Sequence, residues 1–334
     1  VRLLVTTLQA FWLVDTDQRK AFKIHDKYSF YFGISFNNEH IYVSAQNSIY
    51  GEEKNSPHRQ GRILVFDYDF NVVDELIPDF PVRDPHQVYC YDDSIWVAGT
   101  ADDVIAINKE GLWEAWYPFG DPRENNDART YHFNSITVLG ESIYLVGHGD
   151  GSGEVHQFKL SDRSHIRTLT VGRGSHNLWQ SGRGKLFTMS SADGELRTLD
   201  GTDRYPVSIG HFVRGACVLS ETYFFGVSAT TVRKMRNQSP SMIVNFDRSG
   251  NNKTLFGIEG HGEILDLRAP GFEDSAHPSY LGKRIEGMEL MEKFEAVELK
   301  IRPILSSKRM FRRRTNWWWR LNILRHRMPV LGRE

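Results

Sequence analysis

Short apolar segments, each opened by a polar residue and ended by a turn, recur along most of this chain. Residues 86–88 and 134–136 begin with His and Asn, and each is followed after a turn by a second apolar run, at 94–97 and 142–145. Gly, Asp and Asn, which accept tight turns at low steric cost, separate such runs. Runs of this length, rich in β-branched and aromatic residues, predict β-strands. Helical periodicity is almost absent before residue 283.

The predicted strands form five copies of one four-stranded unit. Aligning the second strands places one residue from each copy at an equivalent opening position: Phe32, His86, Asn134, Asn177 and Arg214. Units of roughly 40 to 50 residues with four strands each are typical of a β-propeller. We therefore predict an all-β propeller whose blades have four strands each.

The two ends of the repeat region supply a sixth unit. Residues 3–7, 11–15 and 20–24 read as three strands that lack an inner partner, and residues 262–267 read as one strand that lacks the other three. Joined, they make one more blade and leave only short, protected strand edges. We predict a six-bladed propeller over residues 1–282, closed by N- and C-terminal strands that share one blade. Five or seven blades are the alternatives.

Residues 283–334 differ in composition from the rest. The whole chain has 41 Lys and Arg against 42 Asp and Glu, yet ten of the basic residues and a single acid lie between 302 and 334. Four apolar residues there fall at helical spacing: Trp317, Leu321, Leu324 and Met328. We expect a basic, partly helical tail that docks on an anionic membrane surface or a protein partner, or that packs across the acidic propeller. No recognised nucleic-acid module surrounds it, so nucleic acid is not the expected partner.

Cysteine number and hydropathy bear on location. Cys90 and Cys217 are the only cysteines, so a disulfide framework is excluded and two buried free thiols are expected. The first fifteen residues lack the features of a secretory signal. No apolar stretch reaches the length of about 18 residues that spans a bilayer. We expect a cytoplasmic protein, with peripheral membrane association if the tail binds lipid.

The blade openings predict where chemistry lies, because inner strands converge around the propeller axis. Six residues at or beside these openings are candidates for one site at a mouth of the central channel: His86, His132, Asn134, His176, Asn177 and Arg214. Neutral imidazoles can move protons near neutral pH, so we assign proton transfer to His86 or His176. Arg214 is expected to pair with a ligand anion. The two asparagines and His132 are expected to bind the ligand.

A second, milder polar ring is predicted from the far ends of the second strands. Its members are Gln46, Thr100, His148, Ser191 and Ser228. We expect this ring at the opposite mouth of the channel, and we therefore expect His148 to lie away from the candidate site.

A divalent metal ion is the cofactor that part of this set could hold. Asn134 and Asn177 offer amide oxygens, and Glu263, on the closing strand, offers a carboxylate. These are the hard oxygen ligands that Ca²⁺ and Mg²⁺ prefer. We predict Asn134, Asn177 and Glu263 as metal ligands.

Two short segments carry a family resemblance. Residues 133–136 (Phe-Asn-Ser-Ile) and 176–179 (His-Asn-Leu-Trp) resemble the blade openings of six-bladed propellers of the gluconolactonase and NHL type. The resemblance implies a divalent cation held over the channel and a lactonase-like hydrolysis. Residues 262–271, followed by a Pro-rich exit, are similar to a poorly characterised bacterial group of propellers without an assigned reaction.

The chain departs from the lactonase pattern at three openings, where Phe32, His86 and Arg214 stand in place of acidic residues. This departure favours an anionic ligand. The sequence thus predicts a protein that binds a small polar, anionic ligand at the channel mouth, with metal-assisted or lactonase-like hydrolysis as its enzymatic form. The alternative is a non-enzymatic scaffold that recruits a protein or a membrane surface through its loops and basic tail, since propellers host many unrelated activities.

Overall fold

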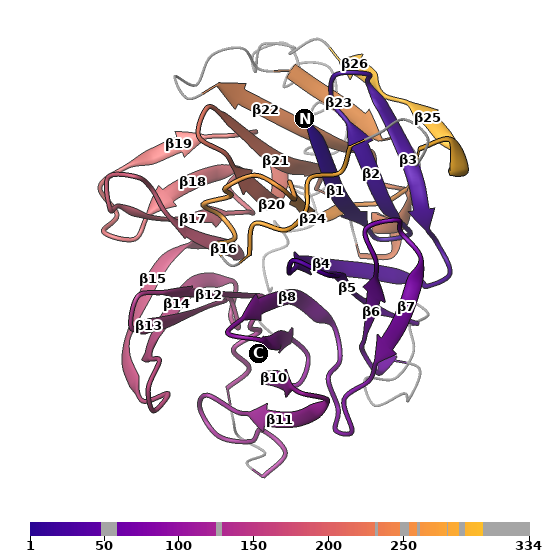
Figure 1. The fold of residues 1–334 in the computed structure, drawn as a ribbon. Helices are drawn as coiled ribbons and strands as arrows, with labels where there is room; N and C mark the ends of the chain where they lie inside the picture. Colours follow the sequence, from indigo (N-terminus) through magenta and orange to yellow (C-terminus); the bar gives the residue numbers. More distant parts are fainter. Residues whose placement is uncertain are drawn as a thin grey trace, which may run out of the picture.

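The structure is a computed structural model that describes residues 1–47, 59–124, 129–230, 233–247, 254–258, 261–278, 280–286 and 291–302. These residues form six antiparallel sheets arranged as a ring (Figure 1). The predicted helical tail, with Trp317, Leu321, Leu324 and Met328, lies outside the described residues, and so do all of residues 303–334.

Each sheet is one blade, and four consecutive strands make up each of the first five. The first is β4 (Phe30–Phe36), β5 (Ile41–Gln46), β6 (Arg62–Phe66) and β7 (Val72–Leu76). The second is β8 (Pro85–Tyr91), β9 (Ser94–Gly99), β10 (Val104–Lys109) and β11 (Leu112–Trp116). The third is β12 (Ser135–Leu139), β13 (Ser142–Gly147), β14 (Ser152–Lys159) and β15 (His165–Arg173).

The remaining blades complete the ring. The fourth is β16 (Ser175–Gln180), β17 (Leu186–Ser190), β18 (Glu195–Thr198) and β19 (Arg204–Pro206). The fifth is β20 (His211–Val218), β21 (Thr222–Ala229), β22 (Ser241–Asp247) and β23 (Thr254–Ile258), with the 3-10 helix η2 (Arg233–Gln238) between β21 and β22. The sixth is β24 (Ile264–Arg268), β1 (Arg2–Thr7), β2 (Phe11–Asp15) and β3 (Lys20–His25).

The inner strands close on one another around the axis. Going round the ring, β4 contacts β8, then β12, β16, β20 and β24 follow, and β24 contacts β4 again. The last blade is shared between the two ends of the chain, because β24 pairs antiparallel with β1 and places Leu267 opposite Val5. The predicted six-bladed propeller with this closure is confirmed.

Burial decreases from the inner strands to the outer ones, as expected for blades packed face to face around an axis. Every residue of the inner strand β24 is buried, and so are all but the first residue of the inner strand β4. The outer strand β7 is exposed or half-buried throughout. Inner strands covered on both faces read as continuous apolar runs, which is why the repeat was visible in the sequence.

Two sheets have a fifth strand that was not predicted. β25 (Ala296–Glu298) pairs with the outer strand β3, and β26 (Lys300–Arg302) pairs with the outer strand β23. Residues that follow the 3-10 helix η3 (Met291–Lys293) therefore bridge the two blades beside the ring closure. The division into a propeller over 1–282 and a tail over 283–334 stays a prediction, since most of the tail is not described.

A crossing segment, residues 269–278 and 280–286, lies over the end of the channel where the inner strands finish. Ser275 N donates to Val218 O (2.9 Å) at the end of β20. The ring of His277 bonds Ser35 Oγ through Nε2 (2.8 Å) near the end of β4, and Tyr280 Oη donates to Asp93 (3.1 Å) after β8. Contacts to three separate blades place this segment across that mouth, which we call the lower mouth.

Two further expectations can be compared with the described residues. Cys90 and Cys217 are buried free thiols, as predicted. In the described part of the chain, no helix has both the length and the apolar character that a bilayer span requires. The cytoplasmic location stays a prediction.

Candidate functional site

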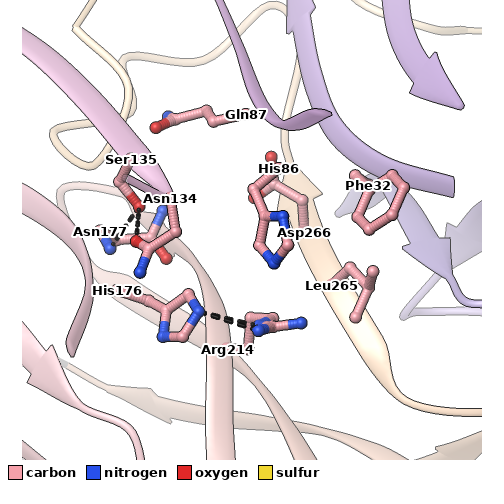
Figure 2. Close-up of a pocket in the computed structure, with 10 residues that line it drawn as sticks. All are labelled: Phe32, His86, Gln87, Asn134, Ser135, His176, Asn177, Arg214, Leu265 and Asp266. Carbon is pink, nitrogen blue, oxygen red and sulfur yellow. Dashed lines mark hydrogen bonds between the residues drawn. The ribbon is translucent and has the colours of Figure 1, made fainter. Parts of the chain in front are cut away.

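The upper mouth, where the inner strands begin, holds a small cavity (Figure 2). Ten residues line it: Phe32, His86, Gln87, Asn134, Ser135, His176, Asn177, Arg214, Leu265 and Asp266. We call it the rim cavity. Measured as the space open to the centre of a water molecule, its volume is about 10 Å³, which is room for about one water. A single ligand atom or a carboxylate oxygen could enter, while the rest of a ligand would lie at the mouth above.

Five of the six predicted channel-mouth residues thus come together: His86, Asn134, His176, Asn177 and Arg214. Equivalent positions in successive blades meet at the axis because each blade repeats the same path of its first strand. His132 does not line the cavity, but its ring centroid lies 5.7 Å from that of His86, which does.

His86 and His176 are held in the same way. His86 Nδ1 lies 2.9 Å from the carbonyl oxygen of Asp84, and His176 Nδ1 lies 2.8 Å from that of Gly174, two residues earlier in each case. A carbonyl oxygen can only accept, so Nδ1 must carry the proton in both rings. When the rings are neutral, Nε2 therefore holds the lone pair.

Arg214 contacts His176 through that lone pair. Its Nε donates to His176 Nε2 (3.2 Å), and its Nη2 lies 2.9 Å from the same atom. The guanidinium also lies over the ring of Phe212, 5.4 Å from the centroid. The arginine is thus held beside the axis by a neutral imidazole and an aromatic face.

His86 and His176 are neutral at physiological pH. Burial lowers the pKa of His86 to about 3, with the positive charge of Arg214 acting in the same direction. Burial, Arg214 and the neighbouring His148 hold the pKa of His176 well below its usual range. A protonated imidazole beside Arg214 would place a second positive charge next to the guanidinium, which is why the neutral form is favoured.

The two asparagines have different roles. The Asn134 amide is used within the fold, because its Nδ2 donates to Ser175 O (2.9 Å) and its Oδ1 accepts from Ser135 Oγ (2.9 Å). Asn177 is buried and has a left-handed backbone, with φ of 53°. Its side chain has no hydrogen-bond partner among the residues that the structure describes, and it lines the cavity.

The expectation that His148 lies at the opposite mouth was wrong. Its ring centroid is 4.1 Å from that of His132 and 5.5 Å from that of His176. β12 and β13 are antiparallel, so the end of the second strand returns to the level where the first began. Burial, with Arg214 next, lowers the pKa of His148 to about 4.

With His148 included, aromatic rings follow one another around much of the upper mouth. Successive centroids lie between 4.1 and 6.2 Å apart. In order, the rings are Phe30, Phe32, His86, His132, His148, His176 and Phe212. We call this set the ring belt.

The predicted metal ligands do not all meet. Asn134 and Asn177 line the rim cavity, but Glu263 is not among its lining residues, and its Oε1 lies 3.4 Å from Arg236 Nε. Among the described residues, no group of three or more His, Cys, Asp or Glu is arranged to hold a metal ion. The divalent metal and its ligand set stay predictions.

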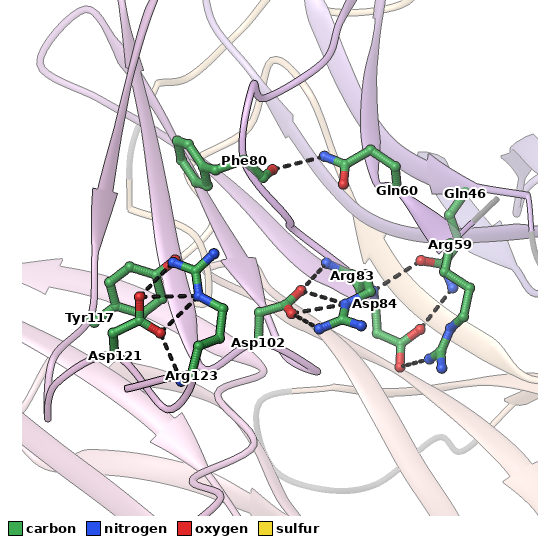
Figure 3. Close-up of polar contacts among 10 residues, drawn as sticks. All are labelled: Gln46, Arg59, Gln60, Phe80, Arg83, Asp84, Asp102, Tyr117, Asp121 and Arg123. Carbon is green, nitrogen blue, oxygen red and sulfur yellow. Dashed lines mark hydrogen bonds and ion pairs between the residues drawn. The ribbon is translucent and has the colours of Figure 1, made fainter. Parts of the chain in front are cut away.

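A charged network supports the backbone that holds His86 (Figure 3). The Asp84 carboxylate accepts from Gln46 Nε2 (2.7 Å) and from Arg59 Nη2 (2.8 Å). Next to it, Arg83 forms an ion pair with the buried Asp102. Because the Asp84 carbonyl fixes the proton position on His86, this network positions that ring.

Sequence reasoning missed several lining residues. Gln87 and Ser135 each lie one position after an opening, Asp266 lies on the closing strand, and all three line the cavity. Their signal was present, because polar residues on inner strands buried on both faces are unusual. Asp266 Oδ1 accepts from Leu267 N and Oδ2 accepts from Ile34 N, both at 2.9 Å.

Comparison with known proteins shows the fold and nothing finer. No protein-family model matches this chain. No curated protein is similar to it at a significant level. The similarities found are therefore to solved structures alone.

Three of these structures cover most of the chain. A chain of the nidogen/laminin complex has a TM-score of 0.57 and 9% identity, over 80% of this chain and 97% of that one. A proposed TolB protein from Agrobacterium tumefaciens has a TM-score of 0.54 and 9% identity, over 91% and 98%. A proposed 6-phosphogluconolactonase from Bacteroides fragilis NCTC 9343 has a TM-score of 0.52 and 12% identity, over 80% and 96%. At such identities the likeness defines the class, a six-bladed β-propeller, and carries no activity to this chain.

Proposed function

We propose that this propeller binds a small anionic ligand at its upper mouth, with one oxygen of the ligand inside the rim cavity. The observation that carries the proposal is the position of Arg214, which lines the rim cavity and donates to the neutral ring of His176. A carboxylate or phosphate oxygen placed there would gain a charge-assisted hydrogen bond, the stronger kind of polar contact.

Three carboxylates near this mouth lie beside other arginines. Glu263 is 3.4 Å from Arg236, and Asp84 is 2.8 Å from Arg59. Asp266, at the bottom of the cavity, lies 3.0 Å from Arg268 and accepts two backbone N–H groups. Among the residues that the structure describes, each of these three carboxylates therefore lies next to an arginine other than Arg214.

The proposed function is ligand binding, and catalysis would be an additional property of the same site. With a pKa of about 3, His86 is a weak base, so its Nε2 would accept a proton readily only from a strong acid. No specific observation favours hydrolysis or a metal, nor does one favour the scaffold alternative over ligand binding.

The test is anion binding by the full-length protein and two variants. Titration calorimetry with acetate and with inorganic phosphate should detect saturable binding of at least one of them. Arg214→Ala should weaken that binding roughly ten- to a hundredfold, the effect of losing a charge-assisted contact. Arg214→Lys should restore it only in part, because an ammonium cannot form the two-pronged contact.

Arg183→Ala is the matched control, since Arg183 is an exposed arginine away from the channel. It should leave the affinity unchanged. Circular dichroism should show that the Arg214 variants keep the β-structure. If neither anion binds, or if Arg214→Ala binds as tightly as the parent protein, the proposed function is wrong.

A further inference from the structure

The face of the propeller around the lower mouth, which we call the lower face, is acidic. Because neighbouring strands are antiparallel, the turns between first and second strands and those between third and fourth strands all lie on this side. The described residues of these turns contain twelve Asp or Glu and four Lys or Arg. They are residues 16–19, 37–40, 67–71, 92–93, 110–111, 140–141, 160–164, 181–185, 199–203 and 219–221.

Several of these carboxylates lack a cation beside them. Glu39, Asp92 and Glu141, from the turns of the first three blades, are exposed, and they form no ion pair with any residue that the structure describes. On the upper side, by contrast, Asp84 and Asp102 each lie next to an arginine. Like charges on one surface repel one another, so a basic segment placed over the lower face would be attracted to it.

The last described strand leads the chain toward this face. β26 pairs antiparallel with β23, with Lys300 opposite Gly257 and Arg302 opposite Leu255. The partner positions therefore run back toward Thr254, where β23 begins. That end of β23 lies on the lower side, because β22, the third strand of the blade, runs toward that side and pairs antiparallel with β23. The chain thus leaves β26 toward the lower face.

Residues 303–334 have the charge that complements this face. They contain nine Lys or Arg and one acid, which leaves 32 basic residues against 41 acids in residues 1–302. An extended segment of this length spans up to about 100 Å, several times the roughly 30 Å of a small domain, so length does not limit where it reaches. On the crossing segment, Leu281 is 50% exposed and offers an apolar contact to one of three consecutive tryptophans, Trp317, Trp318 and Trp319.

We propose that residues 303–334 dock on the lower face of their own propeller, with arginines beside the acidic turns and a tryptophan against Leu281. The docking is within one molecule, because β26 directs the chain to that face and a tethered segment meets it at high effective concentration. Exposed charge pairs are individually weak, so many of them together hold the segment, and salt releases it. This inference is independent of the anion proposed for the upper mouth.

Limited proteolysis of the full-length protein tests the docking. Trypsin cleaves after Lys and Arg, and Arg312, Arg313 and Arg314 lie in the proposed docked segment. The rate of cleavage there, followed by mass spectrometry, reports the population of released segment. A synthetic peptide of residues 303–334 gives the rate without a propeller. Relative to that peptide, cleavage should be slow at about 50 mM NaCl and roughly three- to thirtyfold faster at about 0.5 M.

Removing charge from the lower face should release the segment at low salt. The lower-face variant combines three substitutions of exposed carboxylates: Glu39→Gln, Asp92→Asn and Glu141→Gln. It should be cleaved roughly three- to thirtyfold faster than the parent protein at about 50 mM NaCl. The matched control removes the same charge from the upper side and should be cleaved at the parent rate: Asp26→Asn, Asp79→Asn and Asp150→Asn. Circular dichroism should show the same β-structure in both.

A carbodiimide, which joins an amine directly to a carboxylate, locates the docked segment. Lys308 is the only lysine in residues 303–334, and it should be joined to carboxylates of the lower face within one molecule. Cross-links to upper-side carboxylates alone would overturn the proposal.

Three other outcomes would also overturn it. The first is cleavage of the parent protein and the lower-face variant at the same rate as the peptide. The second is protection that rises with protein concentration, with Lys308 cross-linked between molecules, which would place the segment on a second copy. The third is cleavage at the peptide's rate that slows only when phosphatidylserine vesicles are added, which would make a membrane the partner of the segment.

Discussion

Each end of the central channel holds an arginine beside the axis, and the two ends treat its charge differently. At the lower end the Arg268 side chain is fully buried, lies 3.0 Å from Asp266 and donates to the carbonyl of Ala216. Asp274, on the crossing segment, is also buried there, and Arg268 opposes the rise in its pKa that burial causes. Here the cation is balanced by carboxylates and enclosed by the chain.

At the upper end Arg214 meets uncharged imidazoles. Its guanidinium contacts His176, and Arg214 contributes to the low pKa of His86, His148 and His176. Burial raises the pKa of the neighbouring Glu263, although Arg214 and Arg236 both oppose that rise. The two arginines differ in the partners that the structure shows: Arg268 lies beside buried carboxylates, which stabilises the fold, whereas Arg214 donates to a neutral ring at the site proposed for the anion.

The largest expected effect separates the two arginines by their contribution to stability. Arg268→Met should lower the free energy of unfolding by about 3 to 5 kcal/mol, since it leaves the buried Asp266 and Asp274 without their cation. Arg214→Met should cost about 1 kcal/mol or less, because the buried Glu263 keeps Arg236 beside it. Urea denaturation at pH 7 measures both. Equal losses would contradict the comparison.

The next largest expected effect is the loss of stability when one histidine at each end of the channel is replaced. His277 is buried at the lower end and bonded to Ser35, so His277→Ala should cost about 2 to 3 kcal/mol through the lost contact and the space left behind. His148 is half-buried in the ring belt, so His148→Ala should lower the free energy of unfolding by about 1 kcal/mol or less. Conversely, only His148→Ala should alter the affinity for acetate. A change of affinity in His277→Ala would show that the two ends are not independent.

Acid should destabilise the protein through the same histidines. The pKa of His86 is about 3 and that of His148 about 4 in the folded chain, against about 6.5 when unfolded. Between these values the unfolded state binds more protons, so the free energy of unfolding falls as pH drops below about 6.5. Asp266 acts in the opposite direction, since burial raises its pKa to about 6 and the folded state takes up its proton first.

Because several histidines oppose few carboxyls, we expect a net fall of about 2 kcal/mol between pH 6.5 and pH 5. Urea denaturation across that range measures it. His148→Gln should flatten the dependence, and a stability that rises toward pH 5 would mean that the lower-end carboxyls dominate.

The smallest expected effect is on acetate affinity, when a charge near the upper mouth is removed. Asp84→Asn removes the carboxylate that pairs with Arg59 and should tighten acetate binding about two- to fivefold, since it adds net positive charge near His86. Asp162→Asn, an exposed carboxyl on a distant turn, is the control and should have no effect. Weaker binding in Asp84→Asn would show that the network of Figure 3 matters for positioning His86 more than for charge.

Blade number, ring closure and most of the site could be predicted from the chain alone. Apolar runs such as β1 and β2 are local patterns, and the repeat imposes one register on every inner strand. For that reason the five residues at the aligned strand openings were placed correctly at one mouth. The pairing of β24 with β1 followed from the same count of strands.

What only the tertiary structure decided were contacts between residues distant in the chain. His148 reaches the upper mouth because β13 runs back antiparallel to β12, and the Asn134 amide is bonded to Ser175 in the next blade. Arg268 is balanced by Asp274, which the crossing segment carries across the lower mouth. A strand pattern is determined by neighbours along the chain, whereas the charge state and hydrogen bonding of a side chain depend on burial and on partners that folding brings together.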